Sequence, residues 1–428
     1  MLLPVFNSLE HYLEKRSSFC LDDFAAERES VLEILAAVRE RGDEALKELT
    51  KRYEGAVLEG LQVSEAEIDA ASAAVEPDLA EALREARRNI ESYHRRQLLS
   101  SWWESGPGSL VGQRIRPLGP VGAYIPGGTA AYPSSVLMTV VPAKVAGVKE
   151  ICLCTPPAAD GTVHPLTLLA AREAGAGAVF KIGGAQAVAA LAYGTESVPA
   201  VAKIVGPGNI YVTLAKRELY GRVGIDLLAG PSEIVVVADA GANPAYIAAD
   251  LLSQAEHDIL ARPVLITDSA ELARRVEQEL KEQLSRLPRR EIARRSLKEQ
   301  GALLRLNNLT EAWRAVNELA PEHLELQVAD PWRHLDAIEN AGAVFIGPHT
   351  PEPVGDYWAG SNHVLPTGGT ARYASPLGVA DFIKRTSFVY YSEAALAGAA
   401  PQIEKLARAE GLEAHARAVA IRKENGDA

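Results

Sequence analysis

The sequence contains little cysteine and no uninterrupted apolar run of membrane-spanning length. Its 428 residues include three cysteines, Cys20, Cys152 and Cys154, and so odd and scattered a set excludes the disulfide framework of a small secreted domain. Cys152 and Cys154 alternate within a predicted strand, so we interpret them as small buried hydrophobic residues. The most apolar stretches are each interrupted by a lysine, and none is expected to cross a bilayer.

The chain also lacks an excess of basic residues. It has 44 Lys and Arg against 56 Asp and Glu, which gives a formal net charge of -12. Nucleic acid and anionic membranes are recognised through a basic surface, so neither is the expected partner. No apolar signal segment precedes Glu10, Glu14 and Lys15, and we therefore expect a cytoplasmic protein.

The remaining composition is ordinary for a soluble globular protein, with 47% hydrophobic and 23% charged residues, and the length allows two domains. Residues 22–96 are predicted to be helical, because apolar side chains recur there at helical spacing. Within this region Ser64 and Glu67 form a capping-box pattern, which predicts that a helix begins at this point.

From about residue 112 onward, strand-like and helical runs alternate, and the alternation restarts near Glu233. This βαβ rhythm predicts an α/β fold of two units, each with a mostly parallel sheet covered by helices. Near the C-terminus, residues 403–409 and 412–423 are predicted to be helical, in a tail able to reach a neighbouring subunit. The predicted strands lie at 121–125, 151–154, 178–182, 203–205, 233–238, 263–267 and 343–347.

A clean Gly-x-Gly-x-x-Gly dinucleotide motif is missing after any predicted strand. Three other glycine-rich turns follow strands instead, and open α/β sheets bind ligands at the carboxyl ends of their strands. Any one turn is explained equally well as a tight connection that needs a positive φ. Three together favour a nucleotide-sized ligand. The turns are Tyr124-Ile125-Pro126-Gly127-Gly128, Gly183-Gly184-Ala185-Gln186 and Gly206-Pro207-Gly208-Asn209.

A metal site is indicated by nitrogen and oxygen donors in three separate segments. Gln254 and His257 share one face at the end of an apolar helix. Asp356 lies in a glycine-flanked loop, and His415 lies in the C-terminal tail. Such donors suit Zn²⁺ or a similar divalent ion, although Gln254 and His257 are also compatible with a buried pair that binds no ligand.

An acid stands beside a base at Glu322-His323, directly after Pro321. A histidine next to a carboxyl suits proton transfer near neutral pH, and the alternative is a solvated loop dipeptide. Ser232 precedes another predicted strand, where it either hydrogen-bonds a substrate or forms a turn. Together with the metal donors, these residues predict a metal-assisted acid–base enzyme.

Over nearly its whole length the chain resembles the histidinol dehydrogenase family. No single segment decides this, but the order and spacing of the matching segments do. They are Tyr124-Ile125-Pro126-Gly127-Gly128, Val205-Gly206-Pro207-Gly208-Asn209, Ala229-Gly230-Pro231-Ser232-Glu233, Leu251-Leu252-Ser253-Gln254-Ala255-Glu256-His257-Asp258, Pro321-Glu322-His323-Leu324, the block at 379–387 and the tail at 414–419.

The resemblance implies a fold of two incomplete Rossmann-like domains with small terminal extensions, which agrees with the restart near Glu233. In this numbering it predicts an N-terminal extension at 1–21, a discontinuous first α/β domain at 22–120 and 236–375, a second Rossmann-like domain at 121–235, and a helical C-terminal extension at 376–428 that contacts the partner subunit.

The resemblance also implies an activity: oxidation of L-histidinol to L-histidine with two NAD⁺, through an aldehyde-level intermediate, in a homodimer with one zinc ion per subunit. It implies that Glu322 and His323 form the acid–base pair. The implied zinc ligands are Gln254, His257, Asp356 and His415 of the partner subunit; the NAD contacts are Tyr124, Gln186 and Asn209; and the substrate contacts are Ser232, His323 and the partner's Glu410 together with the zinc ligands.

Two alternatives to this function follow from the same residues. The machinery would equally serve an NAD-dependent dehydrogenase of another amino alcohol, because substrate choice depends on a few pocket contacts. A non-catalytic, metal-dependent binding protein on paired α/β domains is the other alternative. The acid, the base and the turns suited to a dinucleotide all argue against the latter.

Overall fold

The computed structural model describes residues 1–16, 20–127 and 131–424. Gly128, the last residue of the first glycine-rich turn, lies outside the described residues, as do parts of both predicted terminal extensions. Contacts divide the chain into two units: a main body, residues 1–97 and 119–382, and a C-terminal unit, residues 98–118 and 383–428.

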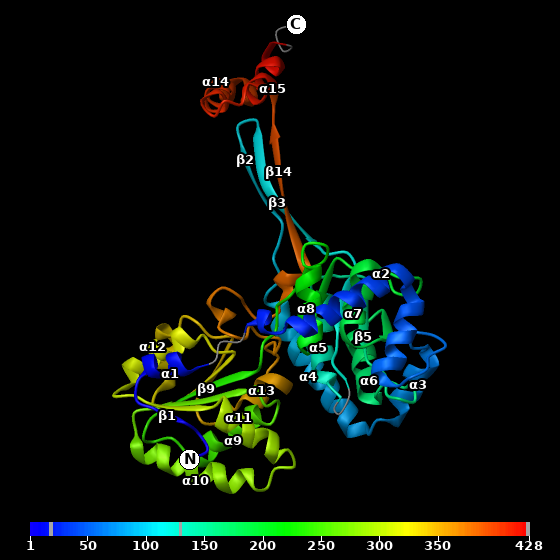
Figure 1. The fold of residues 1–428 in the computed structure, drawn as a ribbon. Helices are drawn as coiled ribbons and strands as arrows, with labels where there is room; N and C mark the ends of the chain where they lie inside the picture. Colours follow the sequence, from blue (N-terminus) through cyan, green and yellow to red (C-terminus); the bar gives the residue numbers. More distant parts are fainter. Residues whose placement is uncertain (17–19, 128–130, 425–428) are drawn as a thin grey trace. The chain divides into compact units, whose positions relative to one another are not determined.

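The N-terminal third of the main body is helical, as predicted (Figure 1). Ser64 caps α3 (Glu65–Ala74) in a complete capping box with Glu67, so this local signal is confirmed. The long helix α2 (Ala25–Glu54) and α4 (Pro77–Arg95) flank it in the sequence. Helix α2 packs on α7 (Gly184–Tyr193) and α8 (Ile210–Leu219), α3 packs on α6 (Pro165–Ala174), and α4 packs on α5 (Pro133–Val145).

The first sheet of the main body is wholly parallel, with the strand order β6-β5-β4-β7-β8. The order reverses between β4 and β7, and in open α/β sheets such a reversal opens a ligand-binding crevice at the carboxyl ends of the strands. Its elements are β4 (Val121–Tyr124), α5 (Pro133–Val145), β5 (Ile151–Thr155), α6 (Pro165–Ala174), β6 (Ala178–Lys181), α7 (Gly184–Tyr193), β7 (Lys203–Val205), α8 (Ile210–Leu219) and β8 (Gly224–Ile225).

A glycine is required at the crevice of this sheet. Gly206, directly after β7, has a φ of +112°, and a side chain there would run into the main-chain carbonyl of Tyr124 at the end of β4. Only glycine combines this backbone conformation with so close an approach. The turn after β7 therefore lies against the end of β4.

The second sheet is also parallel, with the strand order β1-β11-β10-β9-β12-β13. Apolar residues of β9 alternate between two buried clusters: Ile234 and Val236 face α9, α10 and α11, whereas Val235 and Val237 face α1 and α12. The elements are β1 (Val5–Phe6), α1 (Leu9–Lys15), β9 (Glu233–Ala238), α9 (Pro244–Ala255), β10 (Arg262–Thr267), α10 (Ala270–Leu284), α11 (Arg290–Glu299), β11 (Ala302–Arg305), α12 (Leu309–Leu319), β12 (His323–Gln327), β13 (Ala343–Ile346) and α13 (Glu352–Tyr357).

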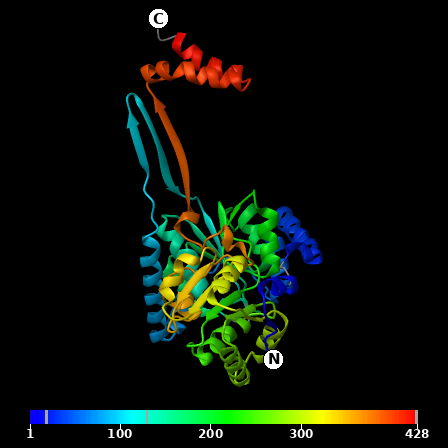
Figure 2. The ribbon, with the colours of Figure 1, turned by 90° about the vertical axis from the view of Figure 1, so that its left-hand side faces the viewer.

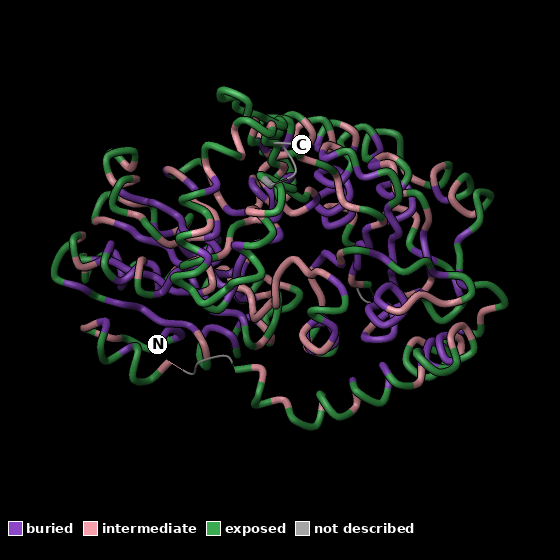
Figure 3. Tube along the Cα trace, turned by 90° about the horizontal axis from the view of Figure 1, so that it is seen from above, coloured by how far each residue is buried: buried purple, intermediate pink, exposed green. Residues whose placement is uncertain are grey.

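Both parallel sheets are buried between helices, as expected for this class of fold. Figure 3 shows the buried segments inside the lobes of the main body, with exposed positions on the helices at their rims. The predicted α/β class with mostly parallel sheets is confirmed. In the described part of the chain, no helix combines the length and the apolar character that crossing a membrane requires.

The C-terminal unit combines an antiparallel ribbon with two helices (Figure 2). Strand β3 (Ser109–Pro117) pairs with β2 (Trp102–Gly106) on one side and β14 (Ile383–Tyr391) on the other. The helices α14 (Glu393–Ala409) and α15 (Glu413–Glu424) pack against each other. Both were predicted, but β14 was not, because its residues are mostly exposed and give no buried alternation.

The contacts also group residues differently from the expected domain boundaries. Residues 22–97 pack around the first sheet, although the expected division joined 22–120 to 236–375. Residues 98–118 belong with 383–428 instead. Periodicity in a sequence identifies a helix and its apolar face, but it does not say which sheet that face covers.

Candidate functional site

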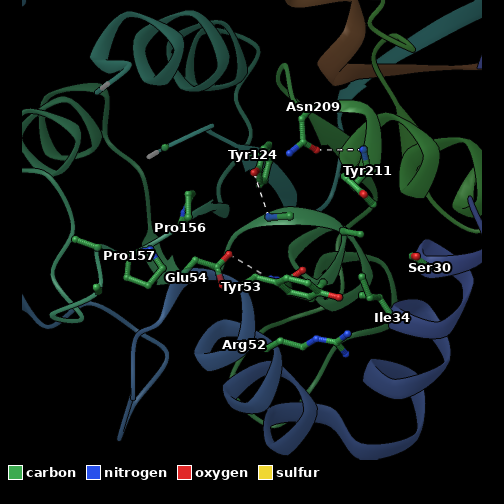
Figure 4. A pocket seen from close by; sticks show the side chains of 16 residues that line it. Ser30, Ile34, Arg52, Tyr53, Glu54, Tyr124, Pro156, Pro157, Asn209 and Tyr211 are labelled. Atoms are coloured by element: carbon green, nitrogen blue, oxygen red, sulfur yellow. Dashed lines mark hydrogen bonds between the residues drawn. The ribbon is translucent and has the colours of Figure 1, made fainter. Parts of the chain in front are cut away.

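A cavity of about 850 Å³ lies at the carboxyl end of the first sheet. Tyr124, Gln186 and Asn209, the three predicted cofactor contacts, all line it (Figure 4). Tyr124 ends a strand, and Gln186 and Asn209 lie at the start of the helix that follows one, which explains why residues so distant in sequence come together. The volume lies within the usual range for small-molecule and cofactor sites.

Tyr124 is fixed by a hydrogen bond at the start of α7. Its hydroxyl accepts a hydrogen bond from the Gly184 N–H at 3.1 Å. Burial raises the pKa of Tyr124 to about 12, so the phenol keeps its proton at physiological pH. The hydroxyl is therefore available as a donor toward a ligand in the cavity.

Asn209 has a structural task in the same place. Its Oδ1 caps α8 by accepting a hydrogen bond from the Tyr211 N–H at 3.1 Å (Figure 4) and another from the Val212 N–H at 3.2 Å. Asparagine is favoured at this position because it satisfies amide groups that have no partner within the helix. The cap fixes the side chain at the edge of the cavity.

Glu54 lines the same cavity and was not predicted (Figure 4). Its Oε1 accepts a hydrogen bond from Gln186 Nε2 at 3.4 Å, whereas Oε2 is buried and has no hydrogen-bond partner among the described residues. Burial raises the pKa of Glu54 to about 7. In the sequence it ends a charged helix, a setting typical of a solvated carboxylate, and no motif distinguishes it.

A second centre lies at the amino ends of strands β9 and β12 of the second sheet. His323 is the first residue of β12, Glu322 precedes it, and both side chains are buried. The predicted acid–base pair is therefore not a solvated dipeptide. It lies opposite the carboxyl end at which parallel sheets usually bind ligands.

The ring of His323 has a defined tautomer. Nδ1 lies 2.9 Å from the main-chain carbonyl of Glu233, and a carbonyl only accepts, so Nδ1 carries the proton and Nε2 has the free lone pair. Burial lowers the pKa of His323 to about 4. The imidazole is consequently neutral at physiological pH and able to accept a proton at Nε2.

Glu322 is held by the main chain of Glu233, at the start of β9. Its Oε2 accepts a hydrogen bond from the Glu233 N–H at 2.9 Å and lies 3.6 Å from His323 Nδ1. Burial raises the pKa of Glu322 well above its ordinary value, and the nearby carboxylates of Glu233, Asp356 and Glu352 raise it further. Such an environment increases the proton affinity of a carboxyl, as a general base requires.

Two more acids surround His323. The ligand atoms of His323, Glu352 and Asp356 lie within 4.8 Å of one another, an arrangement able to hold a metal ion. Burial raises the pKa of Glu352 to about 8 and that of Asp356 to about 6. A divalent cation would supply the positive charge that this group of buried carboxylates needs.

Glu352 was missed by the sequence interpretation. It begins the short helix α13, and Asp356 lies four residues later on the same face. This spacing of two acids is a signal that was present in the sequence. It is weak by itself, because solvated helices often carry acids four residues apart.

Gln254, near the end of α9, is only 1% exposed, and its Oε1 has no hydrogen-bond partner in the described structure. Leaving a buried carbonyl oxygen unpaired is unfavourable, so a ligand at this atom is expected. The charge of His257, three residues later, influences the pKa of both His323 and Glu352. His257 therefore lies near His323 and Glu352, and the predicted binding of one zinc ion by Gln254, His257 and Asp356 stays a prediction.

A buried acid pair joins the three elements that carry this centre. Glu325 on β12 accepts a hydrogen bond from the Glu352 N–H at 2.9 Å, and it hydrogen-bonds Asp250 on α9. Burial and the charge of Asp250 raise the pKa of Glu325 to about 9. The pair therefore keeps a proton at neutral pH, and that proton links β12 to α9.

Ser232 and Glu322 share a smaller cavity of about 150 Å³ with His363. The His363 Nδ1 donates to the main-chain carbonyl of Asp356 at 3.3 Å, and Nε2 lies 3.3 Å from Ser135 Oγ. A substrate in this cavity would contact Ser232 and the carboxyl of Glu322 together. Ser232 lines this cavity, and its predicted contact with a substrate stays a prediction.

The remaining predicted residues, Glu410 and His415, lie in the C-terminal unit. Gly411, with a φ of +75°, separates α14 from α15, and both predicted residues line one hollow of about 650 Å³. They therefore face a common space although they are five residues apart. Their predicted entry into the site of a partner subunit stays a prediction.

Comparison with known proteins gives a consistent result. The family model described as histidinol dehydrogenase matches residues 21–423. A histidinol dehydrogenase of Moorella thermoacetica is 60% identical over 92% of this chain and 94% of its own, and one of Heliobacterium mobile is 54% identical over 97% of each chain. The crystal structure of histidinol dehydrogenase from Elizabethkingia anophelis covers 100% of this chain and 99% of its own, with 36% identity and a TM-score of 0.93.

Proposed function

The chain belongs to the histidinol dehydrogenase family, and from that premise we propose that it oxidises L-histidinol to L-histidine with two NAD⁺ in the cytoplasm. One observation carries the proposal: a neutral imidazole and a carboxyl of raised pKa are buried side by side at Glu322-His323, and His323 forms with Glu352 and Asp356 a group able to hold a metal ion. Alcohol oxidation followed by aldehyde hydration needs two proton acceptors of this kind.

The first step converts the alcohol into an aldehyde. As the carbon loses a hydride, the hydroxyl loses a proton, and His323 Nε2 is the acceptor because Nδ1 is already protonated against Glu233. The second step adds water to the aldehyde before another hydride leaves. Glu322 activates that water, since the surrounding burial gives its carboxyl a high proton affinity.

We propose that zinc is held by Gln254, His257 and Asp356 together with His415 of the partner subunit. When bound, zinc supplies a template that orients the imidazole and amine of histidinol. The buried, unpartnered Oε1 of Gln254 and the raised pKa of Asp356 support this donor set. Ser232 completes the substrate contacts on the side of Glu322.

NAD⁺ is assigned to the cavity lined by Tyr124, Gln186 and Asn209. The cavity has the volume of a cofactor site and lies at the strand-order reversal of a parallel sheet, where nucleotides commonly bind. Enclosure of the substrate between Ser232 and Glu322 would also retain the aldehyde between the two oxidations.

The protein is further proposed to be a homodimer with sites shared between subunits. The C-terminal unit exposes large apolar side chains, including Leu406 and Leu412 beside the hollow that contains Glu410 and His415. Exposed apolar groups of this kind mark surfaces that bind another protein. A second chain would cover them and would gain Glu410 and His415 in its site.

Purified protein with L-histidinol and NAD⁺ tests the function. We expect two NADH for each histidine formed, measured by absorbance and by amino-acid analysis. One NADH with release of free aldehyde would contradict the two-step proposal. Faster turnover with another amino alcohol would identify that compound as the substrate instead of histidinol. Zinc binding without NADH formation would indicate a binding protein.

A further inference from the structure

The main chain of Glu233 contacts both members of the acid–base pair. Its carbonyl accepts the proton of His323 Nδ1 at 2.9 Å, and its N–H donates to Glu322 Oε2 at 2.9 Å. The position of this one residue at the start of β9 therefore determines the tautomer and orientation of the imidazole as well as the direction of the carboxyl.

The side chain of Glu233 is anchored on the other side. It is 3% exposed, and its Oε1 accepts hydrogen bonds from Arg16 at 2.9 Å and from Arg262 at 3.1 Å. Its Oε2 accepts one from the Gly368 N–H at 3.2 Å. These partners come from the end of α1, from β10 and from the turn at 367–369, so one carboxylate connects three segments.

A related hydrogen bond fixes the residues just before Glu233. The Gly230 N–H donates to Thr367 Oγ1 at 2.6 Å, next to the Gly368 contact. The segment from Gly230 to Glu233 is therefore attached to the turn at 367–369 at both ends. Ser232, which faces the small cavity, lies between the two attachments.

We propose that Glu233 is the positioning residue of the acid–base pair. Its clamped side chain fixes the peptide that orients His323 and Glu322, and it touches no reacting atom itself. The inference rests on the proposed function of that pair. Such positioning matters for the catalytic rate because catalytic groups must be held to a fraction of an ångström. A shift of about 1 Å reduces turnover by about 10²-fold.

The test is Glu233→Gln, which keeps the size of the side chain and removes its charge between two arginines. We expect kcat to fall by about 10- to 100-fold, while KM for histidinol and zinc content change by less than about threefold. The matched control is Glu277→Gln, which removes another buried carboxylate. Glu277 lies in α10, and its Oε1 accepts a hydrogen bond from the Leu2 N–H at 2.8 Å. The control should lose stability and keep kcat.

A second variant covers the case in which Glu233→Gln does not fold. Glu233→Asp keeps the charge but shortens the side chain, so the peptide must move or an arginine contact must lengthen. An intermediate loss of kcat supports the proposal. Unchanged kcat in this variant, or the same loss in Glu277→Gln, would overturn it.

Two further readouts separate positioning from general damage. If Glu233 acts through the pair, its substitution should have little additional effect in a background that carries both His323→Asn and Glu322→Gln, whereas an unchanged effect there contradicts the proposal. Nitrogen-15 NMR of labelled histidine should show loss of the Nδ1-protonated form of His323 in Glu233→Gln. This spectrum needs no turnover, so it tests the positioning even if the wild-type protein fails to oxidise histidinol, a result that would reject only the proposed function.

Discussion

The Nε2 atom of His323 lies 3.9 Å from Glu352 Oε1, and both side chains are buried in the main body. The other ring nitrogen carries a proton that it donates to Glu233. The lone pair of Nε2 is therefore directed toward the group of carboxylates that includes Glu352 and Asp356. A substrate hydroxyl bound there would meet a base that is already deprotonated.

His323→Asn is expected to lower turnover by about 10²- to 10⁴-fold, the usual contribution of a general base. Asparagine keeps a hydrogen-bond donor but has no basic nitrogen. Zinc content should be unchanged, because His323 is not among the proposed ligands. Steady-state kinetics and metal analysis measure both, with His349→Asn, an exposed histidine, as the control. Turnover equal to wild type would remove His323 from the mechanism.

Glu322→Gln should spare the first oxidation more than the second. The amide still accepts the hydrogen bond from the Glu233 N–H, but it does not accept a proton from water. Rapid mixing with histidinol or with histidinal separates the two steps. We expect the NADH burst from histidinol to remain and the reaction from histidinal to slow by at least about 10²-fold. Equal slowing of both steps would argue against a hydration role.

Gln254→Met is expected to have opposite effects on the metal-free and the zinc-bound protein. Removal of the unpaired buried oxygen should raise the free energy of unfolding without metal by about 1 kcal/mol. The same change should abolish the stabilisation that zinc provides. Urea unfolding with chelator and with zinc measures both quantities. Gln283→Met, which removes an amide that donates to the Ala245 carbonyl at 3.0 Å, should destabilise the protein in both conditions.

Glu54 should make stability depend on pH. Burial raises its pKa in the folded protein from an ordinary value of 4.5 to about 7, so the folded state binds this proton more tightly than the unfolded state does. The contribution of this proton to the free energy of unfolding is complete below pH 4.5 and is lost as the pH rises to about 7. Because the side chain is only partly buried, we expect a loss of no more than about 2 kcal/mol.

Replacement of this carboxyl tests the sign. We expect the free energy of unfolding of Glu54→Gln, measured by urea titration at several pH values, to depend less on pH over that window than the free energy of unfolding of the wild-type protein does. Glu59→Gln, an exposed carboxylate in the loop after α2, should leave the profile unchanged. A steeper profile in Glu54→Gln would contradict the raised pKa.

His415→Ala should lose zinc and activity but still form dimers. Refolding it together with a Gln254→Ala/His257→Ala variant should restore about a quarter of wild-type activity, because half of randomly formed dimers are mixed and one of their two sites keeps every ligand. Activity and native mass spectrometry follow the recovery. If mixed dimers form without activity, His415 serves its own chain or has no role.

The local parts of the fold were accessible from the sequence. Ser64 and Glu67 mark a helix start through a contact between neighbours in sequence, and Tyr124, Gln186 and Asn209 meet because the carboxyl ends of parallel strands share one edge. Glu352 and Glu54 were missed because burial gives them their chemistry, and each occupies a sequence position typical of a solvated acid. The sheet on which a helix packs is likewise set by tertiary contacts.

The parallel pairing of β1 with β11 has a consequence for synthesis of the chain. Val5 pairs with Leu303, so β1 lacks this partner until about 300 further residues have been synthesised. At the usual pace of translation this wait lasts roughly 15 to 60 s. During that time the edge strand is free to pair with other nascent chains. Pairing of β1 with β11 is therefore a late event in the synthesis of the chain, and slower translation lengthens the time before it forms.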